Sequence, residues 1–100
     1  MNVYKAFGDT IRHLRTQRNE PLRIVAAALD IDSTLLSKME HGERFPTRLQ
    51  LPKFATYFNL AVDDLTALVI ADKILWKYGQ QAVTLQAVNI VKERIEQTYE

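Results

Sequence analysis

The sequence predicts an all-helical protein, and three observations support this fold class. Glycine and proline are scarce, with three of each in 100 residues, so they separate segments without interrupting them. Between them, apolar residues recur at the three- and four-residue spacing of a helix face. No segment shows the alternation of apolar and polar residues that is typical of a half-buried strand. We therefore expect helices throughout, in a chain of one-domain length.

Two helices are expected before residue 30. The first covers about residues 3–18 and carries three apolar residues at helical spacing, which are Phe7, Ile11 and Leu14. The second covers about residues 21–29, and Pro21 suits its first turn because the missing N–H has no helical partner there. Its run of alanines allows another helix to approach closely, as a helix-turn-helix requires.

A short third helix is expected between Asp32 and Gly42. Asp30 begins the preceding turn, because aspartate tolerates left-handed backbone angles. Asp32 is the predicted N-cap, and Gly42 is the predicted C-cap glycine. Leu36 and Met39 are expected to face the core, with Leu35 partly buried. The opposite face is then short and polar, and it consists of Ser33, Thr34, Ser37 and Lys38.

Three more helices are expected over about residues 49–58, 63–78 and 85–99. The fifth is apolar on more faces than one partner helix can cover. The sixth has an apolar face formed by Val88, Val91 and Ile95. Because a two-fold dimer is the commonest way to cover such surfaces, we expect a homodimer formed through residues 63–99.

Composition limits the sites that the chain can form. Cysteine is absent, which excludes disulfides, thiolate zinc sites and cysteine nucleophiles. The longest apolar stretch, residues 65–70, is too short to cross a bilayer, and the first ten residues lack the apolar core of a signal peptide. His13 and His41 each have one acidic neighbour but no third ligand nearby. We therefore expect a cytoplasmic protein that is not an enzyme, with no metal, cofactor or membrane partner.

Charge is unevenly distributed along the chain. Residues 1–53 hold nine Lys and Arg against six acidic residues, for a charge of +3, whereas residues 54–100 sum to −2. A basic first half and an acidic second half favour a phosphate-rich partner at the first half. The net charge of only +1 is weak support for such a partner.

Three stretches resemble a known family. They are Ile11-Arg12-x-Leu14-Arg15, then Ala26-x-x-Leu29-x-Ile31-Asp32-x-x-Leu35-x-Ser37-Lys38-Met39-Glu40-x-Gly42-x-Arg44-x-Pro46, and Leu51-x-x-Phe54-Ala55-x-x-Phe58-Asn59-Leu60-x-Val62-Asp63-x-Leu65. From Phe7 to about Leu68 the chain resembles the Cro/phage-repressor helix-turn-helix proteins, also called the XRE family. The resemblance implies a five-helix, lambda-repressor-like DNA-binding domain at residues 1–66. Residues 67–100 lie outside it, as a helical extension and predicted dimerisation element.

The resemblance also implies roles for individual residues on a double-stranded DNA operator. Ser33, Thr34 and Lys38 would contact base edges in the major groove. Contacts to phosphate or to the adjacent minor groove would come from Ser37, His41, Arg44 and Arg48. Arg15 and Glu40 match a pair that forms an internal salt bridge. The implied protein is a sequence-specific transcriptional regulator, such as a repressor, that acts as a homodimer.

Two departures from the family pattern leave an alternative open. Leu22 stands where the family has a polar residue that hydrogen-bonds a phosphate, so that contact would fall to Arg23 or to the backbone. Asp30 replaces the turn glycine and adds a negative charge. The alternative is a protein-interaction module that keeps the fold without DNA binding, for example an antitoxin-like or adaptor partner.

Overall fold

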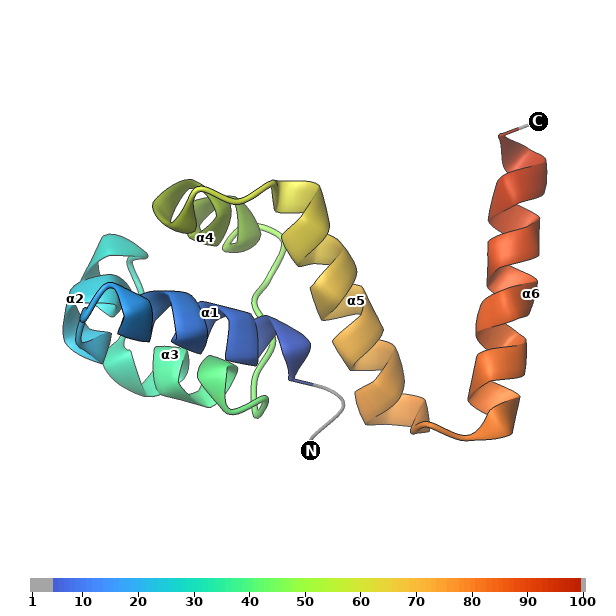
Figure 1. Cartoon of the computed structure of the whole chain (residues 1–100), viewed down its shortest axis with the longest axis horizontal. Coiled ribbons are helices and arrows are strands. Elements are labelled where there is room, and N and C mark those ends of the chain that lie inside the picture. The colour runs from blue at the N-terminus through green and yellow to red at the C-terminus, as the bar shows by residue number, and fades with distance from the viewer. Residues whose placement is uncertain (1–4, 100) are drawn as a thin grey trace.

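The computed structural model describes residues 5–99, which form six α-helices and no strand (Figure 1). The helices are α1 (Ala6–Gln17), α2 (Leu22–Ala28), α3 (Ser33–Glu40), α4 (Leu51–Phe58), α5 (Val62–Tyr78) and α6 (Ala82–Thr98). The expectation of an all-α helix-turn-helix fold with a helical extension is confirmed. Helices α1–α4, here called the four-helix unit (residues 6–58), lie together on one side of α5, and α6 stands apart on the other (Figure 1).

One hydrophobic core joins the four-helix unit to the first half of α5. The rings of Phe7 and Phe54 meet edge to face at its centre, with their centroids 5.2 Å apart. Helix α3 contributes Leu36 and Met39, as the sequence predicts. Helix α5 contributes Leu65 and Val69. The other buried apolar residues are Ile11, Val25, Ala26, Leu29, Leu51, Ala55 and Phe58.

Left-handed residues end four of the helices and set the sharp turns between them. Asn19, Asp30, Gly42 and Asn59 all have φ between 53° and 76°. At the end of α3 the N–H of Gly42 donates to the carbonyl of Met39, and that of Glu43 donates to the carbonyl of Lys38. These bonds satisfy carbonyls that have no partner inside the helix. The predicted left-handed Asp30 and the predicted C-cap Gly42 are both confirmed.

Helix α1 lies unusually close to the end of α3. A Cβ atom on Gly8 would lie 2.4 Å from the carbonyl oxygen of Met39 and 2.7 Å from that of Glu40. Beside this contact, Arg15 Nε donates to Glu40 Oε2 at 2.7 Å, and Arg15 Nη2 donates to Oε1 at 3.0 Å. Glu40 is only 2% exposed, so this two-pronged ion pair is part of the interior. It confirms the pair implied by the family resemblance.

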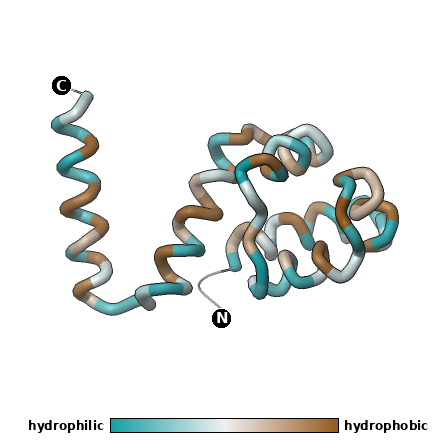
Figure 2. Tube along the Cα trace, turned by 180° about the vertical axis from the view of Figure 1, so that it is seen from behind, coloured by the Kyte–Doolittle hydropathy of each residue, from teal (hydrophilic) through white to brown (hydrophobic). Residues whose placement is uncertain are grey.

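Along most of its length, α6 packs against no other helix of residues 5–99. Thr84, near its beginning, is its buried residue, and its Oγ1 donates to the carbonyl of Tyr78. Apolar positions recur along the rest of α6, although the helix stands clear of the four-helix unit (Figure 2). Two apolar grooves of about 430 and 500 Å³ flank the angle between α5 and α6. Within residues 5–99, no helix combines the length and the apolar character needed to cross a lipid bilayer.

The observed helix bounds differ from the expected ones mainly at the amino ends. Pro21 is the N-cap of α2 and lies just before its first turn. The first helix begins at Ala6, and Val3, where it was expected to begin, lies outside the described residues. The last helix begins at Ala82, three residues before the expected Leu85, because the extended Gln81 already serves as its N-cap.

Candidate nucleic-acid interface

Helix α3 presents a polar outer face while its inner face is locked into the core. Asp32 caps the helix by accepting the N–H of Leu35 at 2.7 Å, as predicted. Thr34 and Lys38, one helical turn apart, are exposed. Ser33 and Ser37 are half-buried beside them. The four residues predicted to line the outer face of this helix therefore do so.

His41 follows α3 and is held against it. Its Nδ1 lies 2.7 Å from the carbonyl oxygen of Ser37, one turn back. When Nδ1 carries the proton and donates to this carbonyl, Nε2 is left to face solvent. The ring is thus held at the carboxyl end of the outer face.

The loop between α3 and α4 carries two exposed arginines. Arg44 lies shortly after the left-handed Gly42. Arg48 lies in a turn closed by two reciprocal hydrogen bonds: the N–H of Thr47 donates to Gln50 Oε1 at 2.9 Å, and the N–H of Gln50 donates to Thr47 Oγ1 at 3.2 Å. This capping box begins the turn that leads into α4 and places the backbone of Arg48.

The two departures from the family pattern have structural explanations. Leu22 is half-buried and packs against the core, so its apolar side chain contributes to folding. Arg23 beside it is exposed. Asp30 is exposed in the turn, and its carboxylate lies 3.9 Å from Lys53 Nζ, which offsets part of its charge.

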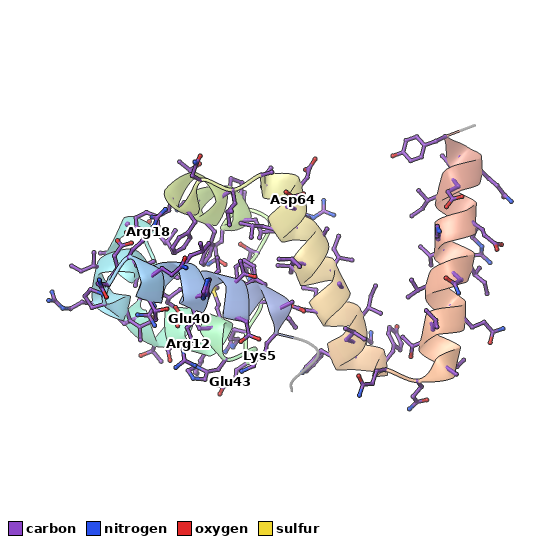
Figure 3. All side chains as sticks on the ribbon, in the orientation of Figure 1. Lys5, Arg12, Arg18, Glu40, Glu43 and Asp64 are labelled. Atoms are coloured by element: carbon purple, nitrogen blue, oxygen red, sulfur yellow. The ribbon has the colours of Figure 1, made fainter. Side chains whose placement is uncertain are left out.

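The basic side chains of this surface are available to a ligand. Among the residues that the structure describes, no ion pair involves Arg23, Lys38, Arg44 or Arg48. Arg15 differs, because hydrogen bonding to Glu40 raises its pKa and commits the guanidinium to the interior. Figure 3 shows Glu40 and Arg12 where α1 and α3 run side by side, with Glu43 near the end of α3. Within residues 5–99, no group of three acidic or histidine side chains is placed to hold a metal ion.

Two contacts that the sequence did not predict join α5 to the elements that carry this surface. The Asp72 carboxylate of α5 accepts the N–H groups of Ala6 at 3.0 Å and Phe7 at 2.9 Å. Phe45, in the loop between the two arginines, meets the ring of Trp76 edge to face, with centroids 6.2 Å apart. Both contacts link residues far apart in sequence, and neither has a local signal beyond a charge inside an apolar run and an aromatic residue in a basic loop.

Comparison with known proteins identifies a related fold. No protein-family model and no curated protein sequence matches this chain. Two crystal structures of the clp gene regulator ClgR from Corynebacterium glutamicum are similar. One is 22% identical over 68% of this chain and 88% of its own, with a TM-score of 0.55; the other is 20% identical over 78% and 96%, with a TM-score of 0.57. At these identities the likeness concerns architecture, and this chain has the all-α helix-turn-helix fold.

Proposed function

We propose that this protein is a transcriptional regulator that binds double-stranded DNA sequence-specifically as a homodimer, with α3 in the major groove. One observation carries the proposal: α3 is anchored by Leu36, Met39 and the buried Glu40, while its opposite face presents only polar side chains. An α-helix fits the major groove, where hydroxyl and ammonium groups can distinguish base pairs. The fold shared with a gene regulator is consistent with this function.

The surface divides into two kinds of contact. Ser33, Thr34 and Lys38 would reach base edges. Phosphate contacts would come from the residues around them, which are Arg23, Ser37, His41, Arg44 and Arg48. Phosphate contacts provide most of the affinity and make it salt-dependent, whereas base contacts provide the sequence preference.

A second copy of this chain is the proposed occupant of the apolar surface on α5 and α6. Ten consecutive residues, 82–91, carry no charge, and five of them are large apolar residues that are 39–63% exposed. With Tyr78 and Ile95, these side chains expose on the order of 700 Å², close to what one partner contributes to a standard stable interface. Each chain carries both a groove between α5 and α6 and an apolar stripe, which is the row of exposed apolar side chains on α6. In a two-fold dimer, the stripe of each copy can therefore pack into the groove of the other.

The decisive experiment is selection of bound DNA from a random pool, followed by affinity measurements on the selected site. We expect a two-fold symmetric site whose halves are about one helical turn, or roughly 34 Å, apart. Lys38→Ala should weaken binding by about 1–3 kcal/mol and relax the preference for one base. Arg48→Ala should weaken all sequences alike and reduce the salt slope by about one.

Arg94→Ala is the matched control, because it also removes one exposed cation, but from α6, which stands apart from α3 (Figure 1). Binding unchanged by Lys38→Ala and Arg48→Ala would rule out the assigned contacts. Failure of the wild type to select any sequence would favour the protein-interaction module, for which the packed Leu22 and the exposed Asp30 argue. Sedimentation as a monomer at micromolar concentration would rule out the homodimer.

A further inference from the structure

Helix α5 has two faces with different partners. On one face Val69 and Asp72 are buried, and Trp76 contacts Phe45 of the four-helix unit. On the other face Ala71, Ile74 and Leu75 line the groove between α5 and α6. At 100° per residue the mean directions of these two sets lie about 140° apart around the helix. The same helix therefore forms a wall of the four-helix unit and a wall of the proposed dimer surface.

Asp72 is the polar connection between α5 and the four-helix unit. It is 1% exposed, and its two carboxylate oxygens accept the first two N–H groups of α1. Such groups have no partner inside their own helix, and Lys5, the N-cap residue of α1, supplies no side-chain cap. The beginning of α1 is thus held by a residue that follows it by 65 positions.

Helix α1, held at its beginning by Asp72, in turn contacts the proposed recognition helix α3. The backbone of Gly8 lies against the carbonyls of Met39 and Glu40 at the end of α3. Arg15, farther along α1, holds the buried Glu40 by two hydrogen bonds. Direct contacts therefore run from Asp72 through α1 to α3. Because these contacts are closely packed, α3 has little freedom to move relative to α5.

A second path runs to the arginine loop. The ring of Phe45 meets that of Trp76 with centroids 6.2 Å apart, and the Lys73 ammonium group lies 5.8 Å from its centroid. Both partners are on α5, within four residues of Asp72. The loop that carries Arg44 is thereby held to the same helix as α1.

We propose that Asp72 is a positioning residue that sets the distance between the two DNA half-sites which the dimer accepts. This inference rests on the proposed function. Each base pair inserted between half-sites moves one of them by about 3.4 Å along the DNA and also rotates it about the axis. If each α3 is held rigidly to the α5 and α6 that form the dimer, the dimer cannot follow that change and loses affinity. If the contact between α5 and the four-helix unit is weakened, α3 can move and the affinity is kept.

The test compares wild-type protein with Asp72→Ala and Asp72→Asn on the selected operator, with spacers altered by one and two base pairs. For the wild type we expect a loss of about tenfold or more per altered base pair, and for Asp72→Ala less than about threefold. Asp72→Asn keeps one acceptor oxygen and should fall between them. Asp64→Ala is the control, because this exposed carboxylate lies on the same helix near its beginning (Figure 3).

Two further measurements separate positioning from general stability. Sedimentation should show that Asp72→Ala stays dimeric, and binding to an isolated half-site should change by less than about twofold, since the residues that touch DNA are intact. If Asp72→Ala does not fold, the same spacer test is made with Asp72→Asn and with Phe45→Leu. The latter leaves the cap of α1 intact.

Folded variants that keep the wild-type spacer preference would overturn the inference. A monomeric Asp72→Ala would overturn it too. Either result would leave the proposed function standing. A wild type that selects no DNA at all would overturn the proposed function first. The two failures are therefore distinguishable by the wild-type result alone.

Discussion

The four-helix unit and α6 are both helical, but different interactions hold them in place. Each helix of the unit buries one face in a shared core, and ion pairs and backbone contacts fix how the helices cross. Helix α6 has 17 residues and buries only Thr84. The comparison shows that apolar residues at helical spacing specify a helix in both places, while a partner surface is needed to position it.

The largest effect should come from removing the buried carboxylate of the four-helix unit. Glu40→Ala leaves Arg15 with an unpaired charge in a site that water scarcely reaches, so we expect a loss of about 3–5 kcal/mol in the free energy of unfolding. Urea unfolding followed by circular dichroism measures it. Glu93→Ala on α6, which removes an exposed carboxylate, should change the same quantity by less than about 0.5 kcal/mol. Equal effects would abolish the distinction between the two regions.

A smaller but still clear effect is expected at the helix crossing. Gly8→Ala places a methyl group against backbone carbonyls that have no room to move, so α1 and α3 must separate, at a cost of about 1–3 kcal/mol. Thermal unfolding detects this. At Gly79, between α5 and α6, an added Cβ would meet no atom within 4 Å. Gly79→Ala therefore adds backbone strain alone, because φ 75° and ψ −179° suit glycine almost exclusively. A Gly8→Ala variant as stable as the wild type would contradict the packing described.

Substitutions on α6 should affect dimerisation, which depends on protein concentration, and should hardly affect the stability of the single chain. Val91→Glu adds a charge to the apolar stripe, so it should abolish the homodimer while changing the stability of the isolated chain by less than about 0.5 kcal/mol. The wild-type melting temperature should rise with protein concentration, and that of the variant should not. Asn89→Glu adds the same charge outside the stripe and should remain dimeric. A concentration-independent wild type would contradict the proposed dimer.

The smallest effect concerns pH. The Tyr57 hydroxyl donates to the Glu20 carboxylate, and this hydrogen bond raises the pKa of Tyr57 above its usual value of 10. A raised pKa means that the stabilisation is complete below about pH 10 and is lost as the pH rises through the folded-state value. Tyr57→Phe should therefore be less stable than wild type by about 1 kcal/mol near pH 8. Denaturant unfolding should show the difference shrinking at alkaline pH; a constant difference would exclude ionisation of this residue as its cause.

Local features were predicted well from the sequence, whereas long-range contacts were not, apart from the Arg15–Glu40 pair that the family resemblance implied. Asp32 as N-cap, Asp30 in a left-handed turn and Gly42 at the end of α3 were predicted, because each acts within four residues of its own position. Asp72 has no such local signal, because in the sequence it is only a charge inside an apolar run. Its role depends on where α5 crosses the beginning of α1, which no local pattern contains.

The assignment of DNA contacts remains a prediction that the structure leaves in place. Thr34 and Lys38 are exposed on α3, and Arg44 and Arg48 are exposed on the loop that follows it. The division of the chain after residue 66 is likewise a prediction. Val69 and Asp72 are buried beyond that point, so the extension is continuous with the wall of the four-helix unit.

The sequence by itself determined the helices, their order, and the polar outer face of α3, because helical periodicity, capping residues and left-handed turns act over a few residues. Only the tertiary structure decided that α5 serves two surfaces and that Asp72 caps α1, because both depend on the angle at which distant helices meet. That angle follows from the packing of the whole core, to which Gly8, Phe54 and Val69 contribute from separate parts of the chain.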